Sequence, residues 1–98
     1  MIQGIDVNQR IEFVSENDKV EPKTIFVFRP LSGFEMLEIE DGEKGNLKIR
    51  KFLNETICEI KGIENKESFI NSLPIAILGE LIKKANEINS FSEIETKN

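Results

Sequence analysis

The stretch Thr24-Ile25-Phe26-Val27-Phe28-Arg29-Pro30-Leu31-Ser32 decides the fold, because its hydrophobic pattern changes there from that of a strand to that of a helix. Its first part is rich in β-branched and aromatic residues, which are enriched in strands. Pro30 ends this strand, since proline has no backbone N–H to donate to a sheet. Ser32 and Glu35 then have the spacing of a capping box, which predicts a helix over about 33–41.

Upstream of this stretch, the sequence predicts a partner strand. Residues 11–15 (Ile11-Glu12-Phe13-Val14-Ser15) begin with alternating apolar and polar side chains, and the polar loop 16–23 joins them to the strand over 24–29. The two strands therefore form an antiparallel hairpin with a long loop. Both faces of the second strand are apolar, so helices or a partner sheet must cover the hairpin.

Two further helices are expected downstream. Asn46 is a candidate N-cap for a helix over about 47–57, where the apolar side chains fall on one arc. Pro74 suits the first turn of a helix over about 74–89, whose apolar side chains cover a wider arc. Gly79 lies at the edge of that arc, and close backbone packing would explain a glycine inside a helix.

Between these helices the pattern is less regular. Residues 58–63 alternate, as a short third strand or as the tail of the preceding helix, and we expect a strand. Residues 66–72 predict one or two helical turns. The expected fold class is α+β: an antiparallel hairpin with a short third strand, packed on three to four short helices in a single domain over 1–98. We expect residues 1–10 and 93–98 to be mobile ends, with a last helical turn from Ser92.

Composition argues against most catalytic chemistry. The 98 residues include no histidine, tryptophan or tyrosine, and one cysteine. Without histidine the chain lacks the commonest general base and the commonest metal ligand, so we expect no enzyme activity, no metal and no cofactor. Cys58 is expected to be a structural thiol, since no histidine can activate it. The segment 41–46 is expected to be a helix–helix turn, because it lacks the later ligands of a calcium loop.

Charge and hydropathy bear on partners and compartment. Eighteen acidic against thirteen basic residues give a net charge of −5, which disfavours nucleic acid and anionic membranes. The basic residues between Lys44 and Lys51 are expected to form a solvated helix face. The start of the chain has no signal-peptide pattern, and the longest apolar run, 73–78, is too short to span a bilayer. With a single cysteine, the expected compartment is the cytoplasm.

The chain has more apolar surface than a small two-layer core needs. The strand over 24–28 and the wide arc of the last helix both require burial, either inside the molecule or against a partner. Self-association into a homo-oligomer and binding of another protein are both open. The residues expected to be partner contacts or core are Phe26, Phe28, Ile77, Leu78, Leu81 and Ile82.

Three stretches, taken in order, resemble the tail assembly chaperones of bacteriophages and prophages. They are the hairpin with its Arg29-Pro30-Leu31-Ser32 ending, the amphipathic helix around 49–57, and Leu73-Pro74 with the helix and the tail from Asn89 to Asn98. The resemblance implies a non-enzymatic protein that binds the tape measure protein, or another tail protein, during tail assembly in the host cytoplasm. The alternative is a small acidic regulatory or inhibitor protein that binds a single protein target.

Overall fold

The strand over Phe26–Phe28 lies in the middle of a sheet. The structure is a computed structural model that describes residue 2 and residues 4–89. In this part of the chain β1 (Ile11–Phe13), β2 (Phe26–Phe28) and β3 (Ile57–Ile60) form an antiparallel sheet in the order β1-β2-β3. The predicted hairpin is confirmed, with shorter strands than expected. The strand over 24–28, which required burial inside the molecule or against a partner, is the central strand, with β1 on one side and β3 on the other.

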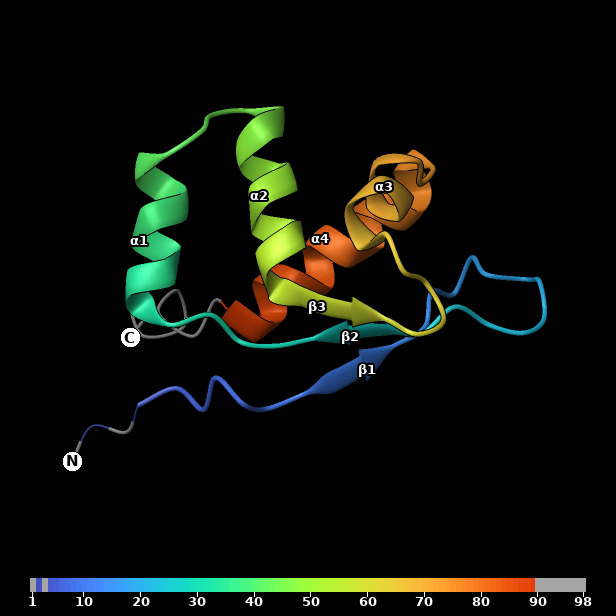
Figure 1. The fold of residues 1–98 in the computed structure, drawn as a ribbon, viewed down its shortest axis with the longest axis horizontal. Coiled ribbons are helices and arrows are strands. Elements are labelled where there is room, and N and C mark those ends of the chain that lie inside the picture. Colours follow the sequence, from blue (N-terminus) through green and yellow to red (C-terminus); the bar gives the residue numbers. More distant parts are fainter. Residues whose placement is uncertain (1, 3, 90–98) are drawn as a thin grey trace.

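Four helices complete the described chain: α1 (Gly33–Asp41), α2 (Asn46–Thr56), α3 (Lys66–Asn71) and α4 (Ile75–Asn89). They lie on one side of the sheet, as Figure 1 shows. The predicted α+β class is confirmed, including the third strand and the short helix that follows it. The carbonyl of Pro74 accepts hydrogen bonds from the N–H groups of Ile77 and Leu78, so the proline leads directly into α4.

A bulge in β3 turns two isoleucines toward the same side. Phe26 is opposite Ile60 and Phe28 is opposite Ile57, with a register shift between Val27 and Phe28. In a regular strand, residues 57 and 60 would point to opposite faces. Because β3 holds one extra residue at the shift, both isoleucines face the helices together with the two phenylalanines.

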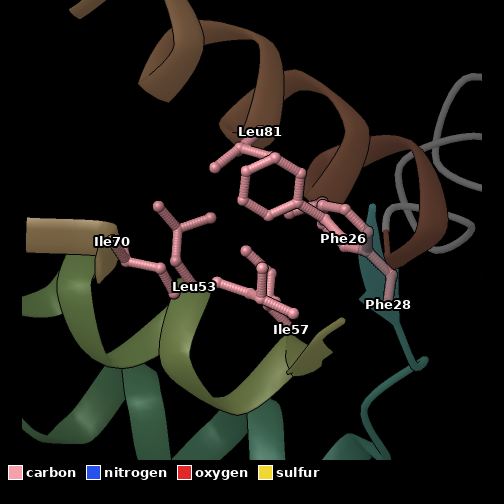
Figure 2. Packing of buried hydrophobic residues seen from close by; sticks show 8 residues of the cluster. Phe26, Phe28, Leu53, Ile57, Ile70 and Leu81 are labelled. Atoms are coloured by element: carbon pink, nitrogen blue, oxygen red, sulfur yellow. The ribbon is translucent and has the colours of Figure 1, made fainter. Parts of the chain in front are cut away.

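The hydrophobic core lies between this face of the sheet and the helices. Its buried side chains come from β2, β3, α2, α3 and α4, and Figure 2 shows them converging. They are Phe26, Phe28, Leu53, Ile57, Ile60, Ile70, Leu81 and Ala85. Phe13 of β1 packs edge-on against Phe28, with ring centroids 6.0 Å apart, which adds the first strand to the core.

The opposite face of the sheet carries charge around one apolar residue. Val27 is 5% exposed and has Glu12 and Glu59 as its neighbours on the two outer strands. The ammonium of Lys61 lies 2.7 Å from the Glu12 carboxylate, so an ion pair extends between the segments on both sides of Val27. The long side chains of such pairs cover apolar surface with their methylene groups, which explains how an apolar strand is buried on both faces.

Ser32 caps α1 as the sequence predicts. Its hydroxyl accepts a hydrogen bond from the N–H of Glu35 at 3.2 Å, and the Glu35 carboxylate accepts one from the N–H of Ser32 at 3.0 Å. The predicted cap at Asn46 is wrong. Asn46 is already the first residue of α2, and the residue before it is Gly45, which has φ of 63° and no side chain to cap with. Glycine suits that left-handed turn.

Two other local predictions have different outcomes. Gly79 makes no close packing contact in the described part of the chain, because no atom from outside its own helical turn lies within 4 Å of the position where a Cβ would be. The interpretation of this glycine as a packing contact is therefore wrong. The last helical turn from Ser92 and the mobile end over 93–98 lie outside the described residues.

A buried cluster of hydrogen-bonded polar groups connects the end of α4 to the segment between β2 and α1. The Asn89 side chain accepts a hydrogen bond from the N–H of Leu31 at 2.8 Å and donates to Thr56 Oγ1 at 3.1 Å. Thr56 Oγ1 in turn donates to the carbonyl of Arg29 at 2.7 Å. Thus three distant segments meet with their polar groups satisfied.

Candidate functional site

The predicted partner residues divide into two groups in the structure. Phe26, Phe28 and Leu81 are 2%, 0% and 0% exposed, and Figure 2 shows their side chains within the core. A side chain so buried cannot contact a partner while the domain stays folded. These three residues therefore belong to the core, which was one of the two roles expected for them.

The other three predicted residues lie on α4 and are half-buried. Ile77, Leu78 and Ile82 each pack one side against the core cluster. Leu78 and Ile82 also line hollows on the surface of the helical layer. The apolar arc of α4 is therefore wider than the core requires, and part of it faces an opening between helices.

The first hollow lies between α1, α2 and α4 and has a volume of about 390 Å³. Its walls are mainly apolar, and its polar residues include Glu40, Lys48 and Asn86. The apolar lining consists of Met36, Ile39, Ile49, Phe52 and Ile82. An opening of this size and chemistry accepts apolar side chains rather than a charged substrate.

The second hollow lies between α2, α3 and α4 and has a volume of about 270 Å³. Its polar residues are Asn46, Arg50 and Asn71. Its apolar lining consists of Ile49, Leu53, Ile70, Ile75, Leu78 and Ile82. Ile75 is 83% exposed and lies at the start of α4, so this hollow has an apolar residue open to solvent.

Ile49 and Ile82 line both hollows, so the two openings are adjacent across this pair. We call the two hollows together the interhelical groove. Ile49 is 40% exposed, and Leu47 on the same helix is 53% exposed. The sequence placed Ile49 on the apolar arc of its helix. It gave no signal that α1 and α4 would leave this side chain partly uncovered.

Ion pairs fix the helices that border the groove. The Lys48 ammonium on α2 lies 2.8 Å from the Glu40 carboxylate on α1, at the rim of the first hollow. This pair is exposed, so its contribution to stability is small, in the range of about 0–1 kcal/mol. Its geometric effect is to hold α1 beside α2. The other basic residues of the predicted solvated face, Lys44, Arg50 and Lys51, are exposed as expected.

A stronger ion pair anchors α1 at its N-terminus. Both guanidinium NH groups of Arg29 donate to the Glu35 carboxylate, at 2.8 and 3.2 Å, and Glu55 of α2 lies 3.6 Å away. The hydrogen bonds from Arg29, with that from the Ser32 backbone, lower the pKa of Glu35 to about 2. One arginine after β2 thus binds two of the three helices that form the walls of the first hollow, α1 and α2.

Other kinds of site have less support in the described residues. Residues 2 and 4–89 contain no group of three or more histidine, cysteine, aspartate or glutamate side chains placed to bind a metal ion. In the same residues, no helix combines the length and apolar character needed to span a bilayer. The Cys58 thiol is half-buried and lies 3.5 Å from the carbonyl of Val27, to which it donates.

Comparisons with known protein families, with curated proteins and with solved structures find no match to this chain. The candidate site is therefore defined by its geometry alone. It is an apolar groove between helices, with polar residues at its rim.

Proposed function

We propose that this protein is a non-enzymatic tail assembly chaperone, which binds an apolar helical segment of a phage tape measure protein in the interhelical groove. The observation that carries the proposal is the pair of adjacent apolar hollows that share Ile49 and Ile82. The resemblance of the hairpin, the amphipathic helix and the proline-led last helix to that family supports it. The proposed location is the cytoplasm of the host cell.

The shape of the groove suits a helix. An amphipathic helix binds a groove through side chains at positions i, i+3, i+4 and i+7, which lie on one of its faces. Two adjacent hollows accept two such side chains. Ile75, which is 83% exposed in the second hollow, then extends the apolar contact toward solvent.

The groove also suits reversible binding. Its two hollows, of about 390 and 270 Å³, hold only a few side chains, whereas a stable interface uses about 20–30 residues on each partner. A chaperone must release its client when the tail tube forms, so a limited apolar contact is an advantage. The net charge of −5 keeps the chaperone soluble at high concentration and attracts clients with basic flanks.

Co-expression with a tape measure protein fragment tests the proposal. The variant Ile49→Glu with Ile75→Glu places charge in the groove at residues that are 40% and 83% exposed, so the fold should survive. The matched control is Val20→Glu, which introduces the same side chain at a 72% exposed residue of the β1–β2 loop. Ile77→Glu is unsuitable, because Ile77 packs against the core.

We expect wild type and the Val20→Glu control to keep the fragment in solution and to co-elute with it, as measured by light scattering after size-exclusion chromatography. The groove variant should lose the fragment while its circular dichroism stays unchanged. If wild type is strictly monomeric and never retains the fragment, the chaperone proposal fails. The small regulatory or inhibitor protein then becomes the better proposal, and the genes on either side of this one become the guide to its target.

A further inference from the structure

The outward side of α1 carries two large apolar residues and two acidic ones. Phe34 is 81% exposed and Leu37 is 57% exposed, and Glu38 and Asp41 are exposed beside them. Spacings of three, four and seven residues place all four side chains on one face of a helix. We call these four residues the acidic–apolar face. A shallow hollow lined by Ser32, Gly33, Phe34 and Leu37 adjoins it.

This face is not needed to attach α1 to the rest of the domain. Ile39 is 2% exposed and Met36 is half-buried in the interhelical groove, so the inward side of α1 supplies its packing. Glu35 and Glu40 bind Arg29 and Lys48. Among residues 2 and 4–89, the attachment of α1 therefore does not use the acidic–apolar face.

The space around the first turn of α1 is open. Among the described residues, and apart from the adjacent residues and the backbone of α1 itself, no atom lies within 4 Å of the position where a Cβ on Gly33 would be. A partner can therefore approach the backbone of α1 next to the phenyl ring of Phe34. An exposed phenylalanine costs free energy in water, and burial of an aromatic ring is a frequent source of binding energy at interfaces.

The charges on α1 indicate what binds there. The helix contains four carboxylates and no basic residue. Within residues 2 and 4–89, neither Glu38 nor Asp41 takes part in an ion pair. A second copy of this chain would bring the same carboxylates into contact, and like charges repel. The complementary occupant is apolar and basic.

We propose that the acidic–apolar face of α1 binds a partner protein through a helical segment that carries leucine-like side chains flanked by lysine or arginine. Phe34 and Leu37 bury the apolar side chains of that segment, and Glu38 and Asp41 pair with its basic ones. This surface lies on the side of α1 that faces away from the interhelical groove. It is therefore a second binding site, separate from the proposed client site, and the two sites could bind two protein segments at once.

A displayed library of helical peptides tests the proposal. Its members carry leucine at positions i, i+3, i+4 and i+7, with all other positions random, and are selected on the intact protein. We expect selected peptides to be enriched in lysine and arginine. Binding of a selected peptide, measured by fluorescence anisotropy, should weaken by about tenfold or more in Phe34→Ala with Leu37→Ala, as at other interface hot spots. It should also weaken with added salt.

Charge-reversal variants distinguish binding of the basic peptide at this surface from its general electrostatic attraction to an acidic protein. Glu38→Lys with Asp41→Lys should abolish binding of the basic peptide and allow a peptide with glutamate in place of lysine to bind. The control Glu59→Lys with Glu64→Lys makes the same change in net charge at exposed residues elsewhere and should keep the basic peptide bound. The groove variant Ile49→Glu with Ile75→Glu should also keep it.

Three results would overturn the proposal. They are a selection that gives no basic peptides, binding that is unchanged by the Phe34 and Leu37 substitutions, and equal loss in both charge-reversal variants. Self-association that disappears in Phe34→Ala with Leu37→Ala would show that a second copy occupies the face instead. The proposed function is tested separately, by co-elution of the tape measure fragment with wild type and with the groove variant. A failure of the α1 proposal can therefore be told apart from a failure of the proposed function.

Discussion

The side-chain oxygen of Asn89, at the end of α4, accepts a hydrogen bond from the backbone N–H of Leu31, just before α1, at 2.8 Å. Both residues are buried, and they are 58 positions apart in the chain. The contact joins the last described helix, α4, to the short connection between β2 and α1. It therefore adds a polar anchor to the packing of Leu81 and Ala85, which also hold α4 and one wall of the interhelical groove in place.

Asn89→Ala should lower the free energy of unfolding by about 1–3 kcal/mol, because it leaves the buried N–H of Leu31 without an acceptor. Urea denaturation measures this directly. Asn86→Ala, an exposed substitution one turn earlier in α4, is the control and should cost less than half as much. Equal midpoints for the two variants would show that the Asn89 hydrogen bond does not stabilise the fold.

Ser32→Ala should lower the free energy of unfolding by about 1 kcal/mol, since it frees the N–H of Glu35 at the start of α1. The control is Ser68→Ala in α3, an exposed serine that is not an N-cap. Thermal unfolding followed by circular dichroism compares the two. No difference from wild type within error would mean that the capping box contributes nothing to stability.

The Arg29–Glu35 pair should make stability depend on acid pH. The pKa of Glu35 is lowered from 4.5 to about 2 in the folded protein, so the unfolded chain binds more protons between these values. The contribution of Glu35 is therefore complete above about pH 4.5 and is lost as the pH falls toward 2. Because the carboxylate is partly exposed, we expect only about 1 kcal/mol at neutral pH.

Glu35→Gln tests this dependence, because glutamine keeps the hydrogen bond to Ser32 but loses the charge. The difference in urea midpoint between wild type and variant should be largest at neutral pH and should shrink by about pH 3. Glu43→Gln, at an exposed loop residue, should show no such change. A difference that stays constant with pH would contradict the assignment of the lowered pKa to this pair.

Gly79→Ala should stabilise the protein by about 0.5–1 kcal/mol, since alanine favours a helix interior and, within residues 4–89, the added methyl group meets no atom of another part of the fold within 4 Å. Gly62→Ala should do the opposite, because Gly62 has φ of 79°, where an L side chain is strained. Thermal midpoints of the two variants should move in opposite directions. A loss of stability in Gly79→Ala would indicate a packing role that the structure does not show.

Local signals predicted most of the fold. The β-branched run before Pro30, the Ser32–Glu35 spacing and the proline before α4 each act within a few residues, so the strand and both helix starts could be read from the sequence. The pairing of β3 with β2 depends on residues about 30 positions apart, and the bulge that turns Ile57 inward has no local sequence signal. For this reason the central place of β2 was not foreseen.

The candidate site was predicted only in part. Leu78 and Ile82 were identified from the wide arc of α4, but Ile49 and Met36 of the groove were not, because their exposure depends on how three helices pack. Asn89 was missed although a signal existed. It lies four residues after Ala85 and eight after Leu81, on the buried stripe of α4, and a polar residue on such a stripe indicates a buried hydrogen bond.

The Leu31–Asn89 contact also determines when the domain can finish folding during translation. Ribosomes add about 5–20 residues each second, so the 58 positions between these residues take about 3–12 seconds to synthesise. For most of that interval the chain still lacks Leu81 and Ala85, which share the finished core with Phe26 and Phe28. The nascent chain therefore exposes its two most buried aromatic rings for seconds before its own last helix can cover them.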